Sequence, residues 1–192
     1  MSFYTTVGDR EKFKIITYSS FLKSFQPQPN PLFMTEEIPT LTKRKIQAQV
    51  IGPIFMEMVE QIGEQRAVEV LDAAIRKAAV VEGRYFAEKA GGQTSMADFI
   101  NLYQNWTKDG ALEMKVLETS DTVFDFDITR CKYAETYKEM GLEKIGHLLS
   151  CNRDGTFCQG YDKKISLVRK QTIMEGASCC TFRYRYNELP AV

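Results

Sequence analysis

The spacing of the apolar residues changes once along this chain, near residue 110, and that change limits the fold more than any other feature. Before it, apolar residues recur every three or four positions, the period of an amphipathic helix. After it, apolar and polar residues alternate over 112–116 and 124–128, which predicts two antiparallel strands joined by a tight turn. Helices followed by strands predict an α+β domain, with an N-terminal layer of three main helices packed on a small, mostly antiparallel sheet formed by the C-terminal half.

The first of these helices is expected after a cap at Thr40 or Thr42, with Gly63 at its end and a kink at Pro53. Its expected core face consists of Ile46, Val50, Ile54 or Phe55, Met58 and Ile62. The second helix spans about 64–89 and is expected to bury Val70, Leu71, Ala74, Ile75, Ala78 and Val81. The third follows a cap at Thr94 or Ser95 and is expected to bury Phe99, Leu102, Tyr103 and Trp106.

Shorter elements are expected after the two strands. Helical stretches are predicted at 132–140 and 142–150, followed by a loop that contains Gly155. Further strands are predicted at 165–168 and 180–186. Alternate residues of the last strand point to opposite sides, so Cys180, Phe182, Tyr184 and Tyr186 share one face, while Thr181, Arg183 and Arg185 share the other.

One domain with an attached segment is the predicted organisation. The 192 residues, 44% hydrophobic and 26% charged, suit one soluble globular domain. A short amphipathic helix is expected at 9–25, and three prolines at alternate positions within 26–31 favour an extended linker. The predicted division is therefore an N-terminal segment with a Pro-rich linker, 1–38, and a single α+β domain that carries the chemistry, 39–192.

The charge balance limits the partners. With 25 basic and 25 acidic residues, the chain lacks the basic excess of a nucleic-acid-binding protein. Residues 1–129 carry 14 basic and 18 acidic side chains, whereas 130–192 carry 11 and 7. That asymmetry fits a small anionic ligand near the C-terminal part, although ordinary scatter explains it equally well. No apolar run is long enough to cross a bilayer, so no membrane partner is expected, and the apolar helices suggest a homo-oligomer.

All five cysteines lie in the last third of the chain: Cys131, Cys151, Cys158, Cys179 and Cys180. Their odd number, without a secretory leader, predicts a reduced, cytoplasmic protein and no disulfide framework. His147 is the only histidine, so one chain cannot form a mainly histidine-ligated metal site. No cofactor is expected, and a zinc ion held by Cys131, Cys151 and Cys180 is the alternative.

Two stretches place a cysteine beside charged residues. In 129–135, Cys131 and Glu135 share a helix face, and Arg130 lies where a strand becomes a helix, a position that favours an anion and a thiolate. In 149–154, Cys151 is followed by Arg153, which could lower the thiol pKa, and by Asp154, which could transfer a proton. A structural cysteine or an incidental surface loop explains either stretch without chemistry.

A third stretch, 171–183, places Glu175 at a turn and contains the adjacent Cys179 and Cys180. Side chains of neighbouring residues in an extended segment point to opposite sides. Only one of these two cysteines is therefore expected to face any given site.

These three stretches, in this order, resemble the L-2-amino-thiazoline-4-carboxylic acid hydrolase family. The matching segments are 129–135, 149–154 and 171–177, followed by Cys180 and 182–184, and the helix around 44–53 is also similar. The resemblance implies a hydrolase that opens a cyclic amidine, namely a five-membered thiazoline ring bearing a carboxylate. The chain departs from the family where the family tends to read His-Cys-Asp and this sequence has Cys179, Cys180 and Thr181.

The residues and the resemblance together give a hypothesis for the site. In it, Arg130 or Arg153 pairs with the substrate carboxylate, and Cys151 attacks the electrophilic ring carbon as a thiolate. The expected catalytic residues are Cys151, Asp154, Glu175, Cys131 and Glu135. The expected substrate-binding residues are Arg130, Arg153, Tyr133, Cys180 and Arg183.

Three other hypotheses compete with this one. A small biosynthetic enzyme on the same fold could catalyse cyclisation, isomerisation or rearrangement by acid–base chemistry. A zinc ion on the cysteines could activate water. A non-catalytic ligand-binding or helical interaction module would be favoured if the three stretches failed to meet in one pocket.

Overall fold

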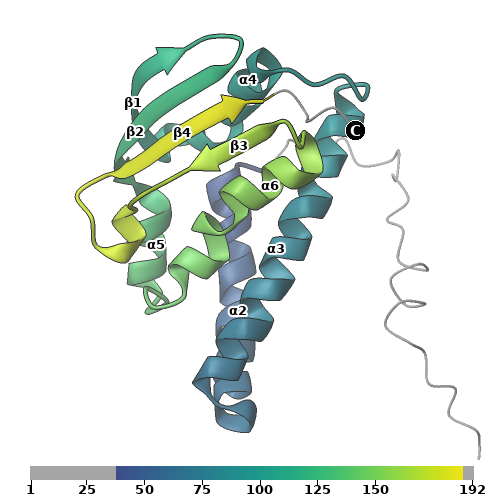
Figure 1. Ribbon diagram of the computed structural model, residues 1–192. Helices are drawn as coiled ribbons and strands as arrows, with labels where there is room; N and C mark the ends of the chain where they lie inside the picture. Colours follow the sequence, from purple (N-terminus) through teal and green to yellow (C-terminus); the bar gives the residue numbers. More distant parts are fainter. Residues whose placement is uncertain (1–37, 188–192) are drawn as a thin grey trace, which may run out of the picture. The chain divides into compact units, whose positions relative to one another are not determined.

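The computed structural model describes residues 38–187, all of which belong to one compact unit. The helix expected at 9–25 and the linker at 26–31 lie outside the described residues. The described part is an α+β domain, as predicted (Figure 1). Three helices come first, followed by a 3-10 turn: α2 (Thr40–Ile62), α3 (Glu64–Lys89), α4 (Met96–Thr107) and η1 (Lys108–Gly110).

Within residues 38–187, four strands form one sheet: β1 (Leu112–Thr119), β2 (Val123–Cys131), β3 (Ile165–Val168) and β4 (Cys180–Tyr186). Their order is β1-β2-β4-β3, and every neighbouring pair is antiparallel. All four strands lie where the alternating pattern predicted them. Ser120 closes the turn between β1 and β2, since its side-chain oxygen accepts hydrogen bonds from the backbone amides of Thr122 and Val123.

Three short helical elements connect β2 to β3, and a 3-10 turn precedes β4: α5 (Lys132–Glu139), the π-helical turn η2 (His147–Cys151), α6 (Arg153–Tyr161) and η3 (Ile173–Glu175). The expected loop after Cys151 is wrong, because Gly155 lies inside α6. Much of the helix expected at 142–150 is a turn, and only its end becomes η2. Two glycines in α6 lower its intrinsic helix propensity, so the helix depends on tertiary packing.

The helix boundaries follow local signals in part. Ser95 caps α4 by accepting a hydrogen bond from the Asp98 amide, as expected. Gly63, at φ 79°, ends α2 as expected. Neither Thr40 nor Thr42 caps that helix, because both lie inside it.

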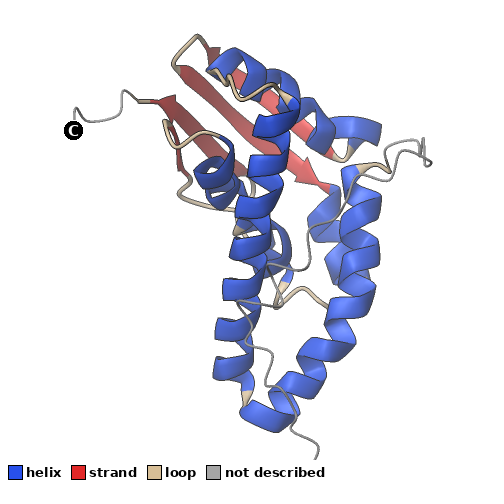
Figure 2. Cartoon of the chain, turned by 90° about the vertical axis from the view of Figure 1, so that its right-hand side faces the viewer, coloured by secondary structure: helices blue, strands red, loops and turns tan. Residues whose placement is uncertain are grey.

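The helices pack on one face of the sheet, and α2 and α3 extend side by side well beyond it (Figures 1 and 2). Two clusters of buried residues result. One fills the space between the sheet, α4 and α6, and includes Phe99, Phe126, Phe157 and Tyr184. The other lies among α2, α3, α5 and η2, and includes Phe55, Leu71, Tyr137 and Leu148. None of the described helices has the length and apolar content needed to cross a membrane.

The expected core face of α2 is confirmed at Phe55, which is buried, and at Met58, which packs against the core, but it is wrong at the three residues that follow the expected period before them. Ile46, Val50 and Ile54 are 50%, 60% and 54% exposed. The residues that α2 buries are Arg44, Ala48, Gly52 and Phe55. Small residues let α2 approach its neighbours closely, so that a Cβ added at Gly52 would lie 3.2 Å from the Leu142 side chain. The large apolar residues that dominate the sequence pattern consequently face outward. In α3, Leu71 and Ile75 are buried as expected, whereas Val70 and Val81 are exposed.

Candidate functional site

A cavity lies where the two core clusters meet. Its apolar wall comes from α4, the sheet and η3 and consists of Tyr103, Trp106, Leu112, Ile128, Met174 and Phe182. Its polar wall comes mainly from α2, η2 and α6 and includes Arg44, Ser150, Arg153, Asp154 and Arg169. The cavity volume is about 60 Å³, which holds only a few water molecules. Binding of an organic ligand therefore requires the walls to move apart.

Residues of all three cysteine-bearing stretches line this cavity. Cys131 and Tyr133 come from the first stretch, and Cys151, Arg153 and Asp154 from the second. Cys180 and Phe182 come from the third, because they share the inward face of β4, as the alternation predicted. A non-catalytic module would have been favoured if the three stretches had failed to meet in one pocket. Because they do meet, the structure gives that alternative no such support.

Arg130 and Glu135 lie outside the cavity. They form an exposed ion pair in which Arg130 Nε lies 2.8 Å from Glu135 Oε1 and Nη2 lies 3.1 Å from Oε2. The hydrogen bond that Arg130 donates to the Glu135 carboxylate raises the pKa of Arg130. Both residues line a shallow surface groove that Cys131 also borders. Arg130 and Glu135 therefore belong to this surface groove and not to the cavity.

Glu175 does not line the cavity, and its side chain bonds to Thr172 within a turn. The Thr172 hydroxyl donates a hydrogen bond to Glu175 Oε2 at 2.7 Å, and the Glu175 amide donates to Thr172 Oγ1 at 3.2 Å. These two bonds fix the turn η3. The turn η3 places Met174 on the apolar wall of the cavity.

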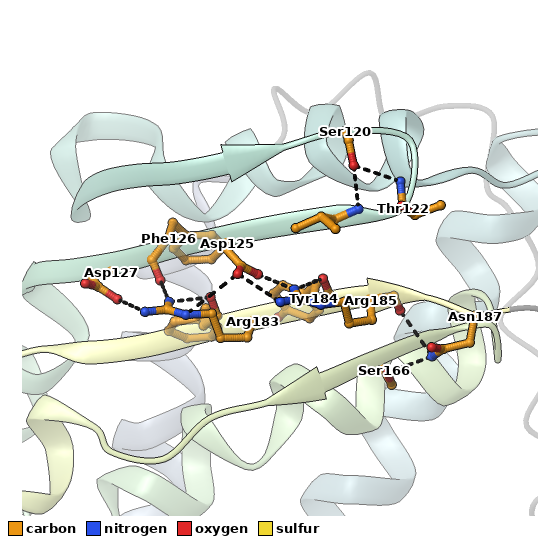
Figure 3. Close-up of polar contacts among 12 residues, drawn as sticks. Ser120, Thr122, Asp125, Phe126, Asp127, Ser166, Arg183, Tyr184, Arg185 and Asn187 are labelled. Atoms are coloured by element: carbon orange, nitrogen blue, oxygen red, sulfur yellow. Dashed lines mark hydrogen bonds and ion pairs between the residues drawn. The ribbon is translucent and has the colours of Figure 1, made fainter.

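Arg183 lies on the outer face of the sheet (Figure 3). Its Nη2 donates to Asp127 Oδ1 at 2.9 Å, and its Nη1 donates to the Phe126 carbonyl at 2.8 Å. Asp125 pairs with Arg185 beside it. Because residues of β4 alternate, the strand that points Cys180 and Phe182 inward must point Arg183 away. Arg183 consequently has no place in the cavity.

Arg169 is a cavity residue that the sequence did not single out. It forms an ion pair with Asp154, and its Nη2 donates to the Cys151 carbonyl at 2.9 Å. Its guanidinium also lies 5.2 Å from the centre of the Phe182 ring. The only available signal was its position in the sequence, two residues before the third cysteine-bearing stretch, 171–183. Cys151 and Arg169 also border a surface groove with Arg76 and Lys163, so they separate the cavity from solvent.

The three cavity thiols are protonated at neutral pH. Burial raises the pKa of Cys131 to about 11 and raises the pKa values of Cys151 and Cys180 as well. At Cys151, the nearby carboxylate of Asp154 adds to the effect of burial, and Arg169 opposes it. The expectation that Arg153 would activate this thiol is not met, because Arg169 is the cation that favours its thiolate. A preformed thiolate at Cys151 does not fit these surroundings.

Asp154 is the acid–base candidate of the cavity. Burial raises the pKa of its carboxyl group, and the ion pair with Arg169 counteracts this effect. A carboxylate with a raised pKa is a better proton acceptor than a solvated one. The described residues include no group of three or more His, Cys, Asp or Glu side chains placed to hold a metal ion, so the zinc alternative gains no support from them.

The profile of the L-2-amino-thiazoline-4-carboxylic acid hydrolase family matches residues 43–184. The chain belongs to this family. The matched range includes every residue of the cavity. No curated protein matches the chain.

Two solved structures have low similarity to this family member. One is the phenol-responsive sensory domain of the transcription activator PoxR with phenol, at 12% identity and a TM-score of 0.46, covering 71% of this chain and 73% of that chain. The other is a trafficking protein particle complex subunit 3 from Naegleria fowleri covalently bound to palmitic acid, at 14% identity and a TM-score of 0.42, covering 77% and 96%. At this level of similarity neither structure informs the function of this chain.

Proposed function

We propose that this family member is a hydrolase that opens the ring of a small cyclic amidine bearing a carboxylate, of the thiazoline type. The observation that carries the proposal is the meeting of the three cysteine-bearing stretches in one cavity, with Asp154 on its polar wall. The apolar wall suits the body of a small ring, and the polar wall suits its charged group. Arg169 and Cys151 lie at the boundary with solvent, where a substrate would pass.

The raised pKa values define the order of proton movements in this proposal. Cys151 is the nucleophile and attacks the amidine carbon as a neutral thiol, losing its proton to Asp154 in the same step. The electron pair of the carbon–nitrogen double bond moves to nitrogen, and Asp154 passes the thiol proton on to that nitrogen, which returns Asp154 to its carboxylate form. The ring carbon–nitrogen bond then breaks: the ring nitrogen leaves as an amine with a proton from the exocyclic nitrogen, and the carbon, still bound to Cys151, forms a double bond to the exocyclic nitrogen. Water adds to this carbon, and Asp154 carries its first proton to the exocyclic nitrogen and its second to the Cys151 sulfur, which leaves as the thiol. The net change is the addition of one water molecule.

Incubation with L-2-amino-thiazoline-4-carboxylate, followed by mass spectrometry of the product, tests this proposal. We expect a product heavier by one water, formed by the native protein and by the Cys179→Ser control, whose altered side chain does not line the cavity. We expect Cys151→Ser and Asp154→Asn to lose turnover. Full activity of Cys151→Ser would exclude the nucleophile, and absence of turnover by the native protein would exclude this substrate.

A second candidate is an enzyme that cyclises, isomerises or rearranges a small biosynthetic intermediate by acid–base chemistry. The protonated state of all three cavity thiols favours it, because neutral thiols and a buried carboxylate suit proton transfer. The same mass measurement separates the two candidates. Isomerisation leaves the mass unchanged, whereas hydrolysis adds one water.

A further inference from the structure

Two buried arginines of the cavity wall share one carboxylate, which lines a second, smaller cavity beside the first. Arg44 is 5% exposed, and its Nη2 donates to both oxygens of Glu82, at 3.0 and 2.8 Å. Arg153 is 8% exposed and approaches the same carboxylate, with Nη2 3.6 Å from Glu82 Oε2. Glu82, on α3, is thus the nearest counter-ion of two guanidinium groups that come from α2 and α6. The closer and better-aligned contact belongs to Arg44.

Arg153 is left with unsatisfied donors. Its Nε and Nη1 are buried and have no hydrogen-bond partner, and they are the only such side-chain atoms among the described residues. A buried charge without hydrogen-bond acceptors is costly, because the protein does not replace the water that it removes. Arg153 lines both the main cavity and the smaller cavity beside it. A ligand in this space would supply the missing acceptors.

The balance of charge at this wall defines the ligand further. Arg169 is paired with Asp154, and Arg44 is paired with Glu82, so Arg153 carries the one positive charge in excess. A ligand with a single negative charge would neutralise the wall. A dianion would leave an excess negative charge beside Glu82, and a neutral ligand would leave Arg153 uncompensated.

We propose that Arg153, together with Arg44, forms a carboxylate-binding subsite in which Glu82 fixes the accepted charge at one. Glu82 is therefore a specificity-determining residue: it neutralises one of the two arginines and so excludes dianions. Arg44 and Glu82 lie outside the three cysteine-bearing stretches. This proposal deepens the proposed function, and it rests on that function only for the identity of the ring that bears the carboxylate. The preference for one negative charge is argued independently, from the ion pairs in the cavity wall.

Binding of inert analogues tests the subsite without any turnover. Thiazole-4-carboxylate, its uncharged carboxamide and thiazole-4,5-dicarboxylate share a ring and differ in charge. Calorimetric titration of the native protein should show the monocarboxylate binding about tenfold tighter, or more, than either of the others, because each leaves a charge uncompensated. Equal or tighter binding of the carboxamide, or no binding of the monocarboxylate, would overturn the proposal.

Variants then assign the subsite to its residues. Arg153→Met should abolish binding of the monocarboxylate while leaving the ligand-free protein at least as stable as the native one, since it removes a buried charge that has two donors without acceptors and leaves Glu82 bonded to Arg44. A structural role for Arg153 predicts the opposite, namely a loss of stability with binding retained. The matched control is Arg66→Met, which removes an exposed arginine paired with Glu69 on α3 and should change neither quantity.

Glu82→Gln tests the selectivity itself. With that carboxylate neutralised, two positive charges are in excess, so the dicarboxylate should bind more tightly than the monocarboxylate. Unchanged preference in a folded Glu82→Gln protein would overturn the role of Glu82. Failure of hydrolysis is distinguishable from failure of the subsite: binding of thiazole-4-carboxylate without turnover of the thiazoline substrate would exclude the hydrolase and leave the subsite intact.

Discussion

At the scale of single residues, the protonated thiols of the cavity give a direct prediction. With a pKa of about 11, Cys131 is a thiolate in roughly one molecule in a thousand at pH 8. Alkylation of Cys131 by iodoacetamide should therefore be slow and should accelerate about tenfold per pH unit up to pH 9. Peptide mass spectrometry gives the rate, and Cys131→Ser confirms the assignment. A plateau below pH 9 would reveal a preformed thiolate and contradict the expected protonation.

The pH dependence of turnover depends on Asp154. Burial favours the protonated form and raises its pKa, so the carboxylate needed as a proton acceptor is lost as pH falls through that raised value. The acid limb of kcat/KM should therefore lie above the ordinary aspartate pKa of about 3.9. Arg169→Met removes the cation that lowers the pKa of Asp154 and should move this limb to higher pH. An acid limb unaffected by Arg169→Met would assign it to another group.

How far the site could be predicted from sequence depends on how local each contact is. Cys151, Arg153 and Asp154 lie together in the chain and also in the cavity, so their pattern was informative. Arg130 and Glu135 lie equally close in sequence, yet they pair with each other at the surface. Arg44 was not predicted, because it meets Arg153 only after α2 has packed against α3 and α6. The spacing of residues along the chain cannot predict a proximity that depends on the packing of three helices.

At the scale of elements, α3 and α6 pack closely through glycines. A Cβ added at Gly160 would lie 2.0 Å from the Val80 carbonyl oxygen, and one added at Gly83 would lie 2.3 Å from that of Phe157. Real Cβ atoms do not approach backbone oxygens so closely, so α3 and α6 would have to move apart. Since α6 carries Arg153 and Asp154, the two glycines position the polar wall of the cavity.

Gly160→Ala should consequently destabilise the protein by about 2 kcal/mol or more, because overpacking outweighs the better helix propensity of alanine. The matched control is Gly155→Ala in the same helix, where the added Cβ would meet Leu167 at an ordinary 3.7 Å. That substitution should stabilise by up to about 1 kcal/mol. Urea unfolding measures both. A Gly160→Ala protein as stable as Gly155→Ala would show that the two helices tolerate a wider spacing.

The same close packing explains which elements could be predicted. The strands followed from their alternating residues, and the three long helices from their period. The buried face of α2 did not, because Ala48 and Gly52 give little hydrophobic signal although they lie against neighbouring elements. Helix α6 was missed for a related reason, since its glycines read as loop residues while α3 holds them in a helix. Helices that pack closely do so through glycine and alanine, and these residues contribute little to the hydrophobic periodicity from which buried faces are predicted.

At the scale of the whole molecule, the cavity joins the two core clusters. Tyr103 and Phe182 on its wall belong to the cluster beneath the sheet, whereas Tyr133 belongs to the cluster among the long helices. Leu112 and Cys131 pack against both clusters. A ligand in this position would contact both halves of the core, and its binding would stabilise the two halves together.

Unfolding should therefore be a single cooperative transition in urea. Trp106 is the only tryptophan and lines the cavity, so its fluorescence reports the cluster beneath the sheet, whereas far-UV circular dichroism reports mainly α2 and α3. Both signals should give the same midpoint, and thiazole-4-carboxylate should raise both midpoints equally, because it binds only the folded state. Loss of the helical signal at lower urea than the Trp106 signal would mean that α2 and α3 open as a separate unit. In that case Arg44 would leave the cavity before the sheet unfolds, and the ligand would protect the helical signal more than the fluorescence.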